Sequence, residues 1–176
     1  MFDPLRVVGL SSHDSKRAIV VPFRSIEDPT KMFYSLDEYR EIIEIFRRFF
    51  VSPHHRKVGH NSGYYDRMVI EHHFKVTPTP HLDTIGLHKF VEPELPHSLG
   101  YVGSVYTDIH SWKQGKASSN AQRDEDLWLY NARDCGVTAM SVRPLVQAVT
   151  DRDQLKQHAF WPFLQGVCVD LHKVGM

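Results

Sequence analysis

The sequence predicts an α/β fold. Short β-rich segments alternate along the chain with segments whose apolar residues recur at helical spacing. Such alternation is typical of a sheet covered by helices. The 176 residues, of which 41% are hydrophobic and 24% charged, suffice for a hydrophobic core. No apolar run is long enough to cross a membrane, and the first residues lack the pattern of a signal peptide.

The first half of the chain contains the clearest local signals. Its predicted elements are a hairpin of strands at 5–12 and 17–23, a helix at 36–50, a strand at 56–60 and a helix at 63–74. Ser35 and Glu38 form a capping box before the first helix, and apolar residues follow at intervals of three and four. This pattern predicts a helix with one buried face.

The second half begins after the break at 77–80. Its predicted elements are a strand at 81–85, helices at 86–91 and 98–106, an exposed polar loop at 107–121 and a long helical region at 122–149. Pro144 lies inside the long helical region, where its ring removes a backbone hydrogen bond. We therefore expect a kink or a split there.

Two segments about seventy residues apart each place a carboxylate beside a tyrosine on a predicted helix. Tyr130 and Asp134 are four residues apart, so they share one helix face. Asp66 falls in the first turn of its helix, with Asn61 as the expected cap. Carboxylate oxygens suit Mg²⁺ or Mn²⁺, and two such ions about 4 Å apart can hydrolyse a phosphodiester. The alternative is two solvated helix charges and one core aromatic residue.

These residues resemble motifs of the DEDD-type 3′→5′ exonuclease domains, in the tyrosine subgroup. The pattern Asn61-x-x-x-Tyr65-Asp66 is similar to the second motif of that family, and Tyr130-x-x-x-Asp134 to the third. The resemblance implies metal ligation by Asp66 and Asp134, and a Tyr130 hydroxyl that orients the attacking water.

The same resemblance implies contacts to nucleic acid at the mouth of the site. The residues expected to make them are His60, Asn61 and Tyr65. For His60, a surface or capping role fits equally well. The implied substrate is the single-stranded 3′ end of DNA, and the implied cofactor is Mg²⁺ or Mn²⁺.

The family has an RNase H-like fold with a five-stranded mixed sheet. Its first motif, Asp-x-Glu on the central strand, is absent from this chain, which removes two of the four expected metal ligands. We therefore expect a sheet without its first, central strand. The facing edges of strands 5–12 and 56–60 then need an upstream segment, a partner chain or direct pairing with each other.

A further resemblance lies near the end of the sequence. Residues 158–170 are similar to the join between exonuclease and polymerase domains in family A DNA polymerases, and residues 83–113 to phage-type members. We expect an exonuclease-like domain at 1–150 and the start of a polymerase domain at 151–176. The implied function is proofreading. The alternatives are a non-catalytic DNA-binding or structural remnant, a fragment that needs an upstream partner, or an RNase of the same superfamily.

The net charge and the cysteine content agree with a nucleic-acid enzyme of this kind but do not by themselves indicate one. The formal net charge is zero and the pI is about 7.2, so no global basic surface marks nucleic-acid binding. The two cysteines form no CxxC motif, which favours a reducing compartment. We expect a cytoplasmic location, in a bacterial or phage-infected host cell, and no membrane partner.

Overall fold

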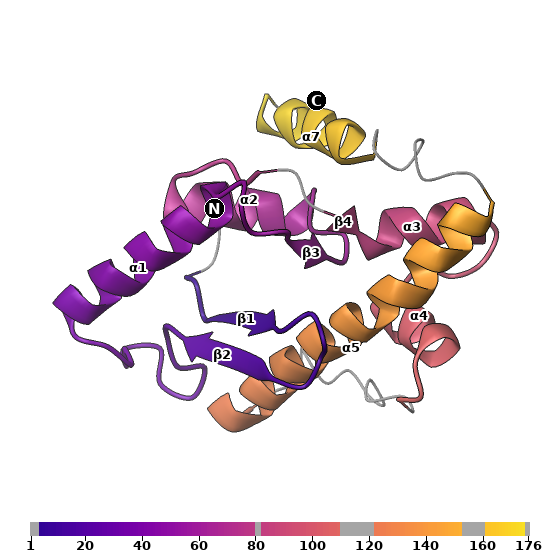
Figure 1. Ribbon diagram of the computed structural model, residues 1–176. Helices are drawn as coiled ribbons and strands as arrows, with labels where there is room; N and C mark the ends of the chain where they lie inside the picture. Colours follow the sequence, from indigo (N-terminus) through magenta and orange to yellow (C-terminus); the bar gives the residue numbers. More distant parts are fainter. Residues whose placement is uncertain (1–3, 80–81, 110–121, 153–160, 175–176) are drawn as a thin grey trace.

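The computed structural model describes residues 4–79, 82–109, 122–152 and 161–174. Figure 1 shows the elements in chain order: β1 (Val7–Ser11), β2 (Ala18–Pro22), α1 (Leu36–Val51), β3 (Val58–Gly59), α2 (Tyr65–Phe74), β4 (Leu82–Asp83), α3 (Thr84–Val91), α4 (Leu99–Tyr106), α5 (Asp124–Asp151) and α7 (Trp161–Lys173). The α/β class is confirmed. Of the predicted loop at 107–121, residues 110–121 lie outside the described part of the chain.

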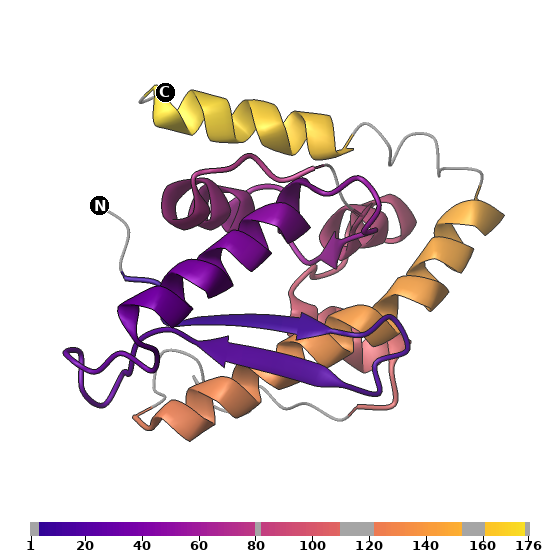
Figure 2. The same ribbon diagram turned by 60° about the vertical axis from the view of Figure 1, so that its left-hand side comes forward.

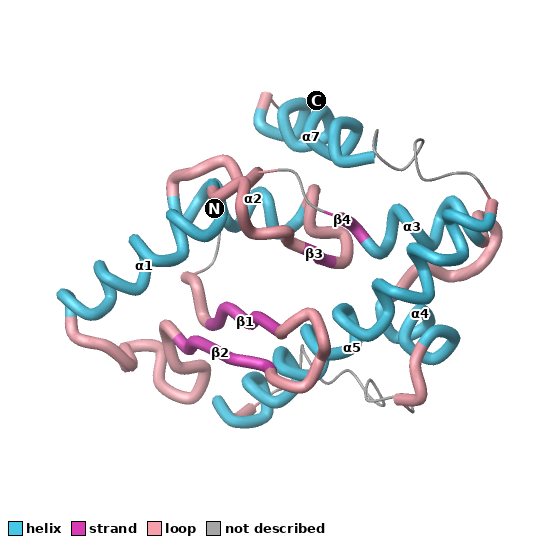
Figure 3. The backbone as a smooth tube through the Cα atoms, in the orientation of Figure 1, coloured by secondary structure: helices cyan, strands magenta, loops and turns pink. Residues whose placement is uncertain are grey.

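The strands form two separate sheets rather than one (Figure 3). β1 and β2 pair antiparallel as the predicted hairpin, with Gly9 opposite Val20. β3 and β4 pair in parallel over two residues each. In the described part of the chain no strand ladder joins β1 to β3, so the direct pairing that we considered as one remedy is absent.

One face of the hairpin carries an aromatic core formed with α1 and α2 (Figure 2). The buried rings are Phe23, Phe46, Phe50 and Phe74, and Val8, Leu10 and Val21 of the hairpin pack against them. The rings contact one another mostly edge-on or tilted, at centroid distances between 5.1 and 6.4 Å. The capping box between Ser35 and Glu38 is present at the start of α1, as predicted.

Helix α5 covers the opposite face of the hairpin. Its buried N-terminal residue Asp124 accepts hydrogen bonds from the Ser25 hydroxyl (2.6 Å) and the Ile26 amide (2.7 Å). Farther along, α5 contributes Leu145 and Val149 to a second core with α3 and α4. The helix is therefore held at both ends by buried contacts.

Pro144 lies inside α5, which runs unbroken from Asp124 to Asp151. Of the two predicted effects of the proline, the split is wrong and the kink stays a prediction. The buried residues Ser141, Leu145 and Val149 lie on both sides of the proline, and their packing outweighs the lost backbone hydrogen bond.

Helix α7 lies against the side of the molecule that carries β3 and β4 (Figures 1 and 2). Arg67 of α2 contacts Asp170 of α7 at 3.4 Å, and Lys173 forms an ion pair with Glu71. The proposed boundary at residue 150 falls within α5, and the division into two domains stays a prediction. No helix in the described ranges combines the length and apolar character that a bilayer span requires.

Gly9 allows α5 to pack closely on the hairpin. A Cβ atom at this position would collide with the Asn131 side chain and approach the Cys135 sulfur to 2.8 Å. We predict that Gly9→Ala lowers the free energy of unfolding by about 1–3 kcal/mol, because overpacking forces the helix outward. Urea denaturation measures this change.

Gly136→Ala is the matched control, because nothing lies within 4 Å of a Cβ built at this helical glycine. It should stabilise the protein by about 0.5–1 kcal/mol. Asn131→Ala, which removes an oxygen without a hydrogen-bond partner, should recover most of the Gly9→Ala loss in the double variant. Equal destabilisation by both glycine variants would contradict the close-packing account.

Candidate functional site

A groove of about 950 Å³ lies between β1 and β3. The edges of these two strands form two of its sides. Helix α5 lines it with residues of one helix face: Asn131, Asp134, Cys135, Thr138, Ala139 and Val142. Helix α2 contributes Asp66, Val69, Ile70 and Phe74 at similar spacing. The groove is thus mainly apolar, with two acidic residues on facing elements.

Asp66 and Asp134 both line this groove, and the closeness of their carboxylates stays a prediction. The negative charges of both aspartates act on the Cys135 thiol. Burial raises the pKa of this thiol to about 11, and the charges of Asp134 and Asp66 add to the effect of burial. A thiol with such a pKa stays protonated at neutral pH, so Cys135 is a poor nucleophile.

Asp66 is exposed to solvent in the groove, although many protein atoms surround its carboxyl. Desolvation raises the pKa of its carboxyl to about 6, and the negative charge of Asp83 adds to the shift. Because water reaches the carboxyl of Asp66, it moderates the effect of desolvation on the pKa of this group. No hydrogen bond or ion pair from the described residues compensates the Asp66 charge.

The buried Asp83 carboxylate holds the surrounding loop in place. Its side chain caps α3 through the Ile85 amide (3.0 Å) and accepts the Asn61 amide (2.9 Å). The Gln165 amide group of α7 donates to the other oxygen at 2.8 Å. Asp83 therefore joins the loop after β3, the start of α3 and helix α7.

Asn61 does not cap α2, so that prediction is wrong. The N-cap is Tyr64, without a side-chain hydrogen bond, and Asn61 adopts a left-handed conformation with φ 59°. Asparagine tolerates this region better than most residues. The conformation directs the Asn61 amide to Asp83, and its side chain stays on the groove wall.

The other predicted site residues are distributed differently. His60 lines the groove, and its Nδ1 lies 2.9 Å from the Thr84 hydroxyl. Tyr65 is 59% exposed and lies outside the groove lining. Tyr130 is half-buried one turn before Asp134 and is likewise not among the groove residues. The roles of all three residues stay predictions.

The described residues do not form a complete metal cage. They contain no cluster of three His, Cys, Asp or Glu side chains arranged for a metal ion. Asp83 is no substitute ligand, because both of its oxygens already accept hydrogen bonds. Mg²⁺ in proteins is often held by one or two carboxylates together with water and substrate phosphates. Asp66 and Asp134 are the acidic residues of the groove lining.

Two of the basic residues that line the groove, Lys57 and Lys89, interact with other parts of the protein. The Lys57 ammonium group donates to the carbonyls of Ser52 (2.9 Å) and His55 (3.1 Å). Lys89 lies over the Trp161 ring at 4.9 Å. Arg56, which also lines the groove, is the basic side chain best placed to meet a phosphate.

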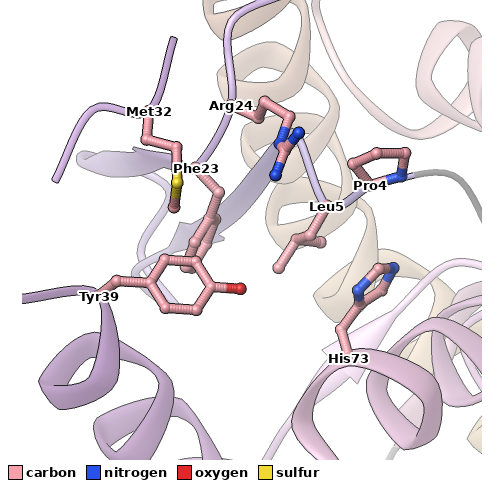
Figure 4. Close-up of a pocket in the computed structure, with 7 residues that line it drawn as sticks. All are labelled: Pro4, Leu5, Phe23, Arg24, Met32, Tyr39 and His73. Carbon is pink, nitrogen blue, oxygen red and sulfur yellow. The ribbon is translucent and has the colours of Figure 1, made fainter. Parts of the chain in front are cut away.

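A second pocket, about 180 Å³, lies beside the aromatic core (Figure 4). Figure 4 shows Leu5, Tyr39 and His73 around its opening, with Arg24 on the opposite side. None of its lining residues is acidic. It offers no metal site and is separate from the two aspartates.

Two residues of this region were not expected from the sequence. Asp83 lies directly before a helical segment, and an Asp at that position is a typical N-cap signal. Gln165 gives no such signal, because its role depends on the packing of α7 against Gly63. A Cβ at Gly63 would collide with the Gln165 side chain.

No protein-family model matches this chain, and neither does any curated protein or solved structure. The residues and their geometry are therefore the whole basis for a functional assignment.

Asp83→Ala should be the more damaging of two substitutions at the buried carboxylate. It leaves the amides of Asn61, Ile85 and Gly63 without an acceptor, at a cost of about 3 kcal/mol or more. Asp83→Asn should cost less, because Gln165 can rotate and present its unsatisfied Oε1 to the new amide. Thermal unfolding of both variants measures the difference, and equal losses would contradict the hydrogen-bond account.

Asp66→Asn should stabilise the metal-free protein at pH 8 but not at pH 4.5. The folded-state pKa of Asp66 lies above its unfolded value, so the folded state binds the proton more tightly. Ionisation therefore costs stability as the pH rises from about 4 through about 6, and the cost persists above that range. The asparagine variant escapes this cost.

Urea denaturation in the presence of a chelator measures the effect. Asp37→Asn is the control, because Asp37 is a surface carboxylate in α1. Its stability difference from the unmodified protein should not follow the same pH course. A pH-independent effect of Asp66→Asn would show that Asp66 carries no folding penalty.

Proposed function

We propose that the chain carries the acidic centre of a metal-dependent 3′→5′ exonuclease of RNase H-like architecture that acts on DNA, with a proofreading role beside a polymerase. The observation that supports the proposal is that Asp66 and Asp134, from motifs far apart in the sequence, line one groove.

Each element has a part in the proposed reaction. Asp66 and Asp134 hold Mg²⁺ or Mn²⁺, which polarises the scissile phosphate and activates water. Asn61 and His60 on the groove wall contact the terminal nucleotide. Arg56 contributes positive charge to the phosphate backbone. Tyr130 and Tyr65 act from outside the groove lining, so their parts depend on how the substrate enters.

The second candidate is a non-catalytic DNA-binding or structural domain that keeps the fold without the chemistry. The absence of a three-residue metal cluster among the described residues favours it. Two carboxylates leave most of the coordination to water and substrate, so metal affinity and geometry both suffer. A supplied Asp-x-Glu segment distinguishes the candidates, because it restores ligands for the exonuclease and does nothing for a remnant.

The test is digestion of 5′-labelled single-stranded DNA with Mg²⁺ or Mn²⁺, with and without an upstream Asp-x-Glu segment. We expect weak or no digestion by the chain alone and digestion from the 3′ end after complementation. Asp66→Asn and Asp134→Asn should each nearly abolish that activity. Tyr130→Phe should cost less than either, within the roughly 10²–10⁴-fold range of a positioned acid–base group.

Asp37→Asn should leave the rate unchanged. Full activity of Asp134→Asn would remove this residue from the mechanism. Persistent inactivity of the complemented, folded protein would favour the non-catalytic candidate.

A further inference from the structure

At the edge of β1 that faces the groove, the backbone groups have no hydrogen-bond partner among the described residues. The Phe23 amide donates to the Arg6 carbonyl (2.7 Å) and the Ser12 amide to the Arg17 carbonyl (2.9 Å), which fixes the alternation of the ladder. Residues of even number in β1 therefore bond to β2. The N–H and C=O groups of Val7, Gly9 and Ser11 point away from β2, and all three residues line the groove.

The facing edge of β3 has the same property. The Leu82 amide donates to the Lys57 carbonyl at 3.0 Å, so Lys57 and Gly59 face β4. The backbone groups of Val58 then point away from β4. Val58 lines the groove and is 41% exposed, which is unusual for a β-branched residue in a sheet next to a core.

The remaining walls and the size of the groove fit a strand. Helix α2 and the aromatic core close one face and α5 closes the other, so a strand between β1 and β3 has helices on both sides. Five residues of strand in such a layer occupy about 17 Å by 4.8 Å by 10 Å, on the order of 800 Å³. The groove measures about 950 Å³.

We propose that the groove between β1 and β3 binds one extended polypeptide strand from outside these 176 residues, which joins the two sheets into one. The outward N–H and C=O groups of β1 and of Val58 can pair with the backbone of a strand placed between them, as in the addition of a strand to a sheet edge. The strand is rich in apolar, β-branched residues, because Val69 and Ile70 of α2 and Ala139 and Val142 of α5 line the groove. This inference holds whether or not the site is a nuclease.

The test uses the whole chain and a capped peptide of about eight residues, made of Val, Ile and Thr with a lysine at each end. Amide exchange is followed residue by residue. We expect exchange at Val7, Gly9, Ser11 and Val58 to slow about tenfold or more when peptide is bound. Exchange at Val8 and Leu10, already bonded to β2, should change far less, which provides an internal control.

Two controls separate strand pairing from nonspecific apolar binding. A peptide with proline at its centre should not protect these amides, because proline lacks a donor. The protein variant Val58→Pro should keep the β3–β4 pair and lose protection by the peptide, because the Val58 amide faces away from β4. If that variant does not fold, the proline peptide on the unmodified protein answers the same question.

If the free peptide binds weakly, its sequence can be fused ahead of Met1 through a flexible linker. The tether raises the effective concentration of the strand at the groove. The proposal is overturned if neither the free nor the fused strand protects the outward amides, or if the proline peptide protects them equally. It is also overturned if these amides are already protected in the free monomer, because the chain then fills its own groove. Strand binding without nuclease activity would refute the proposed function alone.

Discussion

The buried Asp83 carboxylate is the interaction on which the rest of the site depends. It is fully shielded from solvent and accepts hydrogen bonds from two backbone amides at 2.9–3.0 Å and from Gln165 at 2.8 Å. These donors come from the loop after β3, from α3 and from α7. Charge-assisted bonds of this kind are stronger than neutral ones, and their loss leaves buried donors without partners. The carboxylate thus fixes where α2 begins and where Asp66 lies.

The position of Asp83 also sets the electrostatics of the groove. A second carboxylate near Asp66, in surroundings that limit its solvation, raises the pKa of Asp66 and makes its ionised form costly. A cation in the groove relieves that cost. The negative charge of Asp83 therefore adds to the cost of ionising Asp66. The same arrangement is compatible with a structural role in which the cation is missing.

Local sequence signals predicted the elements that depend on local physics. The capping box at Ser35 and Glu38, the apolar spacing of α1 and the hairpin of β1 and β2 all follow from neighbouring residues. The same local rules predicted a cap at Asn61 and a kink or a split at Pro144. Contacts with residues distant in sequence determine the structure at both positions. Asp83 takes the Asn61 amide, and the buried residues around Pro144 keep α5 continuous. Local propensity is overridden where burial is nearly complete.

The site was predictable in part. Asp66 and Asp134 lie in one groove, as their spacing in the motifs suggested, whereas Tyr130 and Tyr65 lie outside its lining. The strands form two sheets, and the identity of the groove edge, Val7, Gly9, Ser11 and Val58, required the hydrogen-bond alternation of the ladders. The role of Gln165 depended on a helix whose packing no local pattern encodes.

The most direct test of the central claim is anomalous diffraction from crystals soaked in Mn²⁺, which locates the ion without reference to activity. The account predicts an anomalous peak in the groove between β1 and β3, about 2 Å from a carboxylate oxygen of Asp66 and near one of Asp134. The peak should disappear in Asp66→Asn crystals. A groove without manganese, or Asp66 and Asp134 carboxylates too far apart to share one ion or a bridged pair, would contradict it.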